Sequence, residues 1–129
     1  MLGIDLVDIN QIKSIYRKHG ILFLRKILNN GEIKDLSRSC AQGRDLPLKE
    51  NLHFFQRLSC YIASKEAIFK ACSKAHLDWK DISIRNITKD PLIYIRERNL
   101  NKKIRLTFSV NGNMVLAQAL LAQNLLKRS

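Results

Sequence analysis

The chain of 129 residues is long enough to form one domain with its own hydrophobic core. Its 23 basic and 11 acidic residues give a net charge of +12, which predicts a polyanionic partner: nucleic acid, anionic lipid, a phosphate-rich small molecule or an acidic protein. Because the basic residues are spread along the chain and the only dense run is 96–105, nucleic acid is the disfavoured member of that group.

The three cysteines lie far apart in the sequence. Cys40, Cys60 and Cys72 form no CxxC pair, so they indicate neither a disulfide framework nor a zinc site. We therefore predict a reducing, cytoplasmic setting. The first twelve residues lack the pattern of a secretory leader, and no stretch approaches the roughly 18 apolar residues of a membrane span. We expect a protein that is neither secreted nor inserted in a membrane.

The N-terminal residues 2–9 are apolar and β-branched, and they predict a first strand that carries Asp5. Gly3, within this strand, leaves room for another segment to approach the backbone closely. From Asn10 to Leu28 the apolar residues recur with mostly helical spacing, but the pattern breaks near Gly20. This region is therefore predicted to form two helices.

The strongest helical pattern covers 53–75 and follows a stretch, 37–52, that lacks periodicity and predicts a mobile loop. At about 100° per residue, the helix has one apolar stripe, and Lys65 projects from within it. Glu66 and Lys70 lie one turn apart on the adjoining flank. The stripe is formed by Leu58, Ile62, Phe69 and Cys72. Because the polar arc is narrow, we expect other elements to cover most of this helix.

The C-terminal half predicts β-structure. Two short β-type runs, 81–87 and 92–95, are joined by a turn that contains Pro91. The run 104–110 alternates apolar and polar residues as a half-buried strand does, and Asn111-Gly112 is the signal of a type I′ hairpin. We predict a strand over 114–121, although its composition also suits a helix.

Two carboxylates stand in apolar surroundings, Asp5 on the first strand and Glu66 on the long helix. A carboxylate is costly to bury unless it is paired or bound to a metal. If the helix packs on the strand, the two could meet and hold a hard cation such as Mg²⁺. The alternative, which pattern alone favours, is that Asp5 caps a turn while Glu66 pairs with Lys70 along the helix. Lys65 has two interpretations as well: its ammonium group reaches water, or it faces a phosphate in a cleft.

Three segments together carry a family resemblance. They are "GIDLVDINQI" at 3–12, "RLSCYIASKEAIFKA" at 57–71 and "LTFSVNGNMVLAQA" at 106–119. In order and separation they resemble the G-x-D strand, the RxxxRFAxKEAxxKA helix and the SxSH hairpin of the holo-[acyl-carrier-protein] synthases, the small trimeric class of 4′-phosphopantetheinyl transferases. The resemblance implies an α+β fold over 1–129, a single domain with a long buried helix packed on a small antiparallel sheet.

The resemblance also implies an activity: Mg²⁺-dependent transfer of the 4′-phosphopantetheine arm of coenzyme A to a serine of apo acyl carrier protein, with release of adenosine 3′,5′-bisphosphate. Asp5 and Glu66 match the metal ligands of the family, and Glu66 is also a candidate base for the serine proton. Lys65 and Lys70 match lysines placed near the pyrophosphate and the reacting centre, and Ser109 matches a residue of the coenzyme A pocket. A homotrimer with shared active sites is implied, and an acidic carrier would suit the net charge of +12.

Some positions depart from the family pattern. The second arginine of the helix motif is Tyr61 here, and the histidine of the hairpin motif is Val110. Glycines after the helix are replaced by Ser73 and Ala75, and the first serine of the hairpin is Thr107. These changes bear on the affinity for coenzyme A. The competing hypotheses are a relative that has lost activity and a small basic protein that binds RNA or an acidic protein without catalysis.

Overall fold

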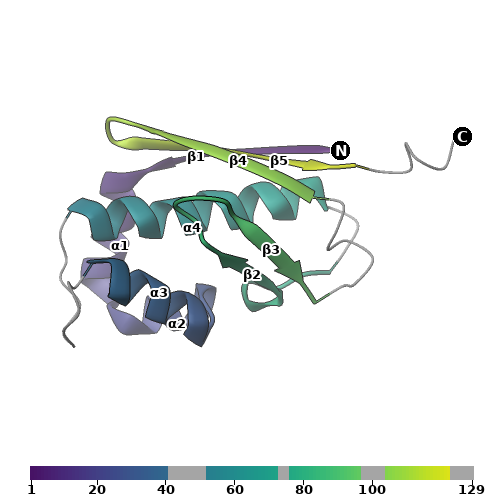
Figure 1. Ribbon diagram of the computed structural model, residues 1–129. Helices are drawn as coiled ribbons and strands as arrows, with labels where there is room; N and C mark the ends of the chain where they lie inside the picture. The colour runs from purple at the N-terminus through teal and green to yellow at the C-terminus, as the bar shows by residue number, and fades with distance from the viewer. Residues whose placement is uncertain (41–51, 73–75, 97–103, 123–129) are drawn as a thin grey trace, which may run out of the picture.

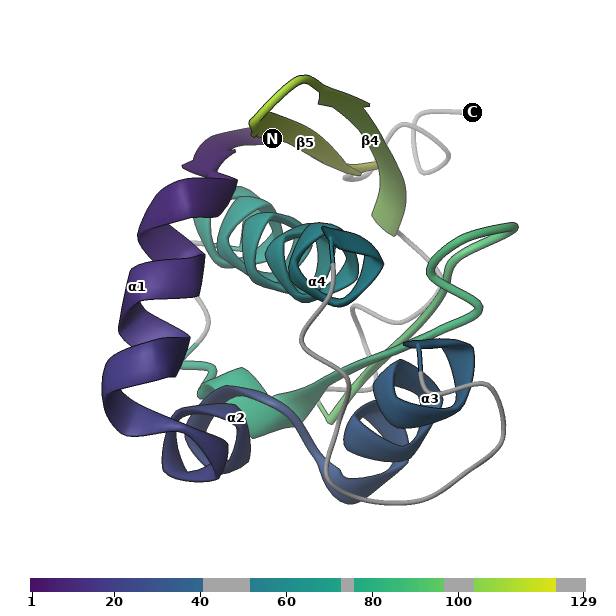
Figure 2. The ribbon, with the colours of Figure 1, turned by 90° about the vertical axis from the view of Figure 1, so that its left-hand side faces the viewer.

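A long helix, α4 (Leu52–Ala71), runs through the centre of the molecule (Figures 1 and 2). An antiparallel sheet covers one side of it, and shorter helices and a hairpin lie on the other side. The computed structural model describes residues 1–40, 52–72, 76–96 and 104–122. No helix in these ranges is long and apolar enough to cross a membrane.

The three-stranded sheet has the order β1-β5-β4 and is antiparallel throughout. Its strands are β1 (Leu2–Asp8), β4 (Ile104–Asn111) and β5 (Met114–Leu121). All three were predicted from the sequence. The β4–β5 hairpin is also confirmed, but Asn111 pairs with Met114, so the two turn residues are Gly112 and Asn113. Of these two turn residues only Gly112 has a positive φ, at +61°, which differs from the type I′ turn that Asn111-Gly112 suggested.

Two helices follow β1, as predicted. Asp8 caps α1 (Ile9–His19), because its side chain accepts a hydrogen bond from the backbone N–H of Asn10. Gly20, with φ +62°, ends α1 and allows the chain to turn into α2 (Ile21–Ile27).

A third helix, α3 (Asn30–Cys40), was not predicted. The expected loop over 37–52 is therefore wrong for residues 37–40 and for Leu52, which begins α4, and residues 41–51 lie outside the described ranges. Asn29 and Glu32 form a capping box at the start of α3: each backbone N–H donates to the side chain of the other, at 2.9–3.0 Å.

The second hairpin consists of β2 (Ile82–Arg85) and β3 (Leu92–Ile95), as predicted, and follows a short 3₁₀ helix, η1 (Trp79–Asp81).

The predicted helix 53–75 corresponds to α4, with residues 73–75 outside the described ranges. As expected, α4 is buried over most of its surface, and its residues form the centre of the core together with the inward faces of both sheets. The predicted α+β class, a long buried helix on a small antiparallel sheet, is confirmed.

Candidate active site

The close approach of β1 to α4 places Asp5 beside Glu66. At Gly3, a Cβ atom would lie 1.9 Å from the carbonyl oxygen of Ala67 and 2.6 Å from the backbone nitrogen of Ala71. Only glycine allows the two backbones to come this close. Asp5, two residues along the strand, points to the same face and is buried against the helix.

Asp5, Glu66 and Lys70 form one cluster. The ammonium group of Lys70 donates to Asp5 Oδ1 and to the carbonyl oxygen of Ile4, both at 3.0 Å, while 56% of the lysine side chain stays exposed. Burial raises the pKa of Glu66, and the neighbouring Asp5 carboxylate raises it further, whereas Lys70 lowers it. The alternative in which Lys70 pairs with Glu66 and Asp5 caps a turn is therefore wrong, because Lys70 bonds to Asp5 in the middle of β1.

The two carboxylates, called the carboxylate pair below, fit a divalent cation. Asp5 Oδ2 is buried and has no hydrogen-bond partner, and the repulsion between the two groups can be relieved by a proton or a cation. Mg²⁺ is commonly held by one or two carboxylates together with water and substrate phosphate oxygens. In the described ranges, no cluster of three or more potential metal ligands exists, so water and substrate would complete such a site.

Lys65 is not part of this cluster. Its ammonium group is fully buried and donates to Glu32 Oε1 (2.7 Å) and to the carbonyl oxygens of Ile27 (2.9 Å) and Trp79 (3.0 Å). Burial lowers the pKa of Lys65, and the Glu32 carboxylate opposes that shift. Both sequence interpretations of Lys65 are therefore corrected: the ammonium group reaches neither water nor an open cleft, because three protein oxygens already accept its hydrogen bonds.

Glu32, the partner of Lys65, was missed by the sequence reasoning. The signal that could have found it is the spacing of Asn29 and Glu32, an asparagine followed three residues later by a glutamate, which is typical of a helix start. Glu32 and Lys65 are 33 positions apart in the sequence, so no local pattern could predict the contact between them.

Ser109 lies on β4, at the edge of the sheet opposite to β1, and is exposed. The structure therefore does not bring it together with Asp5 and Glu66 within one chain. Val110, which stands where the family has a histidine, is exposed beside it.

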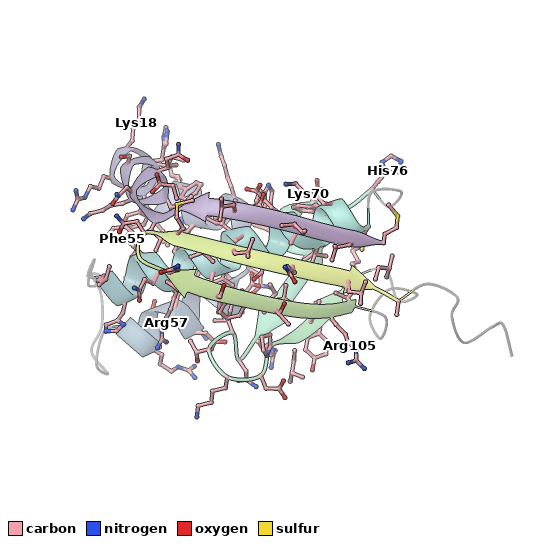
Figure 3. The ribbon with its side chains drawn as sticks, turned by 90° about the horizontal axis from the view of Figure 1, so that it is seen from above. Lys18, Phe55, Arg57, Lys70, His76 and Arg105 are labelled. Atoms are coloured by element: carbon pink, nitrogen blue, oxygen red, sulfur yellow. The ribbon has the colours of Figure 1, made fainter. Side chains whose placement is uncertain are left out.

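A pocket of about 360 Å³ opens on the same side as β4, between α3, α4 and the end of β2. We call it the basic pocket, because it contains Arg38 and Arg57 together with Tyr61. Its other lining residues are Asp35, Leu36, Asn86, Ile87 and Thr88. Figure 3 shows Arg57 on the β4 side of the sheet and Lys70 on the β1 side. The basic pocket and the carboxylate pair thus lie on opposite flanks of α4.

Comparisons with known proteins agree on one family. Residues 1–119 match the model of the 4′-phosphopantetheinyl transferase superfamily. The chain is 33% identical to a holo-[acyl-carrier-protein] synthase of Thermodesulfovibrio yellowstonii, covering 90% of this chain and 92% of the relative. It is 31% identical to the synthase of Ehrlichia ruminantium, with 90% of each covered.

Solved structures show the same fold. The Helicobacter pylori holo-[acyl-carrier-protein] synthase in complex with coenzyme A superimposes with a TM-score of 0.69 at 23% identity, covering 94% of this chain and 99% of that one. The holo-ACP synthase of Plasmodium yoelii gives 0.67 at 28% identity, covering 93% and 91%.

Proposed function

Because the chain belongs to the 4′-phosphopantetheinyl transferase superfamily, we propose that it transfers the 4′-phosphopantetheine arm of coenzyme A to a serine of apo acyl carrier protein. The family and enzyme class expected from three sequence segments, the holo-[acyl-carrier-protein] synthases, are confirmed. The observation that carries the proposed reaction is the carboxylate pair, Asp5 and Glu66, beside the exposed ammonium group of Lys70.

In this reaction the serine oxygen forms a bond to the phosphorus that carries pantetheine, and the bond from that phosphorus to the pyrophosphate bridging oxygen breaks. Adenosine 3′,5′-bisphosphate leaves. We assign the uptake of the serine proton to Glu66, because its carboxylate lies beside Asp5 and Lys70, where the reacting phosphate would be held. Asp5 and Glu66 would hold Mg²⁺, which when bound neutralises charge on the transferred group. Lys70 neutralises the leaving phosphate.

A site shared between two chains would account for the position of the basic pocket. Arginine side chains bind phosphate groups in a bidentate manner, so Arg38 and Arg57 suit the phosphates of coenzyme A. Ser109 lies on the same flank and is the third candidate for this contact. Because this flank faces away from the carboxylate pair, we propose that one chain supplies the basic pocket and its neighbour supplies Asp5 and Glu66.

The outer face of the sheet is the candidate interface for this assembly, a homotrimer. Large apolar side chains on β1 and β5 project away from α4 and are 45–61% exposed: Leu2, Ile4, Leu6 and Leu120. Exposed apolar patches of this kind mark protein–protein contacts. The polar residues of β4, among them Thr107 and Ser109, lie at one edge of the same face.

The carrier protein would dock on the corner between α1 and α2. Exposed Arg17, Lys18, Arg25 and Lys26 gather there beside Leu22, whose side chain is 64% exposed. A basic surface with an apolar centre suits an acidic partner, because opposite charge speeds and orients the encounter.

The cytoplasmic setting predicted from the cysteines stays a prediction.

The decisive experiment is intact-mass spectrometry of an apo acyl carrier protein incubated with this protein, coenzyme A and Mg²⁺, with a parallel sample that contains a chelator. We expect the carrier to gain the mass of phosphopantetheine only in the sample without chelator. The Glu66→Gln variant should lose the activity by a factor of about 10² or more, on the order of a lost acid–base or metal-ligating group.

The matched control changes an exposed carboxyl group that lies away from the cluster. Asp90→Asn removes one negative charge from a surface turn and should retain full activity. No mass gain with several apo carriers, from a protein that is folded by circular dichroism, would reject the proposed reaction. The inactive relative or the non-catalytic binding protein would then be the better hypothesis.

A further inference from the structure

A buried charge network lies on the flank of α4 next to the carboxylate pair. At its centre, Lys65 and Glu32 form an ion pair at 2.7 Å, with side chains that are 0% and 1% exposed. Glu32 Oε1 also accepts from the backbone N–H of Asn29, and Oε2 accepts from the N–H of Ile84 at 2.8 Å. Together with the bonds of Lys65 to Ile27 and Trp79, this network ties α4 to four other segments: the end of α2, the start of α3, η1 and β2.

This network costs free energy to bury and is not an efficient way to stabilise a fold. Removing two charges from water costs several kcal/mol per ion, on the order of what their attraction returns, so apolar replacements of similar size are often neutral. What the network does supply is a preferred orientation of α4. Three donors on Lys65 and both oxygens of Glu32 are engaged by acceptors and donors at fixed positions, so the ion pair constrains how α4 is rotated about its axis.

The rotation of α4 decides where Glu66 points. Lys65 and Glu66 are consecutive, so their side chains leave the helix about 100° apart. On the side of α4 that faces β1, Gly3 lies against Ala67 and Ala71 and fixes the distance between the strand and the helix. The aromatic ring of Trp79 adds a contact to Phe69, one turn after Lys65, with ring centroids 5.1 Å apart.

We propose that Glu32 and Lys65 are positioning residues that hold Glu66 opposite Asp5. This inference rests on the proposed function, because it gives the buried ion pair a role in assembling the carboxylate pair. Both side chains are buried, so neither is accessible to substrate. Lys65 therefore acts through the protein, in contrast to the phosphate contact that the sequence motif implied for it.

The test separates position from stability with a paired replacement. Glu32→Leu/Lys65→Met removes both charges and keeps similar volumes, so the fold should survive, whereas Glu32→Gln alone leaves Lys65 charged without its partner. Mn²⁺ binding to each protein is measured by the electron paramagnetic resonance signal of the free ion. We expect the double variant to fold with a lowered unfolding temperature, because the N–H of Ile84 and the carbonyl oxygens of Ile27 and Trp79 lose their partners. It should bind Mn²⁺ about ten-fold or more weakly, as changes behind a metal site do. Its kcat should fall while its KM for the carrier is unchanged.

The matched control is Asn29→Ala, which removes the helix cap at the same end of α3 but leaves the ion pair intact. It should lower the unfolding temperature without changing the affinity for Mn²⁺. A double variant with the Mn²⁺ affinity and kcat of wild type would overturn the proposed positioning role. So would a loss of affinity in Asn29→Ala that equals the loss in the double variant, because stability alone would then explain both.

A second readout keeps this inference separate from the proposed function. Crystal structures of the wild type and the double variant give the separation of the Asp5 and Glu66 carboxylates directly. We expect a larger separation in the double variant, and an unchanged separation would overturn the positioning role. A wild-type protein that binds no Mn²⁺ and modifies no carrier would reject the proposed function instead, while the separation of the carboxylates would still decide the role of the ion pair.

Discussion

At the scale of single residues, Gly3 sets the geometry of the carboxylate pair. In Gly3→Ala the new methyl group would overlap the carbonyl oxygen of Ala67, a backbone atom that cannot turn aside, so β1 has to move away from α4. We expect a loss of about 1–3 kcal/mol in the free energy of unfolding, which is typical of overpacking. Turnover should fall as well, because Asp5 moves with the strand. Urea denaturation and the carrier mass assay measure the two effects.

The control for this substitution is Gly31→Ala. Gly31 lies in α3, and the nearest atom to an added methyl group there is the side-chain Oδ1 of Asn29 at 3.4 Å, an ordinary contact distance. Alanine also favours helix over glycine by roughly 0.5–1 kcal/mol. Equal effects of the two substitutions on stability and turnover would contradict the close-contact explanation.

The residues of the candidate site could be predicted where the local sequence around each one is unusual, and not where a distant contact decides its role. Asp5 and Glu66 stand out because each is a carboxylate within an apolar run, and the family resemblance pairs them. Lys65 stood out for the same reason, but its partner Glu32 is 33 positions away, in a helix that the pattern did not reveal. A buried lysine and a ligand-binding lysine look alike in sequence, because the difference lies in which oxygens the fold brings to them.

At the scale of elements, the sequence predicted β1, the break at Gly20, α4 and both hairpins, since apolar periodicity and turn residues specify them locally. It did not predict α3. That helix, "NGEIKDLSRSC", presents only Ile33 and Leu36 as large apolar residues, and Leu36 is buried. Its stability comes from the cap at Asn29 and from packing against α4, and the second of these is a tertiary effect that short-range pattern does not contain.

The corner between α1 and α2 gives a prediction about the carrier protein. The double charge reversal Lys18→Glu/Arg25→Glu should raise the KM for an acidic carrier about ten-fold and flatten its dependence on salt, because charges at the rim of an interface steer the encounter. The KM for coenzyme A should be unchanged, since its phosphates are assigned to a different part of the surface. Steady-state kinetics at several ionic strengths measures both constants.

A reversal of equal charge elsewhere controls for the lower net charge. Lys34 is exposed on α3, and Lys34→Glu combined with Lys89→Glu in the turn after β2 also replaces two positive charges by negative ones. This control should raise the KM for the carrier far less. If both double variants weaken the carrier equally, the net charge of the protein attracts the carrier and the corner is not its docking surface.

At the scale of the whole molecule, the two halves of the proposed site face away from each other on one chain. The carboxylate pair lies on the β1 flank of α4 and the basic pocket on the β4 flank (Figure 3). The helical period already places Arg57 and Glu66 on opposite faces of α4, about 180° apart. What the sequence pattern does not specify is which elements lie against each face. A closed symmetric assembly would bring the two flanks of neighbouring chains together at every interface.

Mixed assemblies test this arrangement. Glu66→Gln removes the metal-binding half and Arg57→Glu the basic half, so each variant alone should be inactive in the carrier assay. The two variants are unfolded together in equal amounts and refolded. Each chain at an interface is then the required variant about half of the time, so about one interface in four pairs an intact Glu66 with an intact Arg57. Activity should then return to about a quarter of wild type per site in a closed ring. Light scattering of the refolded sample should give the mass of a trimer.

The matched control mixes Glu66→Gln with Asp5→Asn. Both substitutions lie in the carboxylate pair of one chain, so every site in the mixture contains at least one of them and activity should stay absent. Recovery with Arg57→Glu but not with Asp5→Asn requires that the two halves come from different chains. No recovery in either mixture, from refolded trimers, would mean that one chain supplies both halves. Arg57 would then have to reach the substrate around α4, and the outer face of the sheet would need another explanation than a shared site.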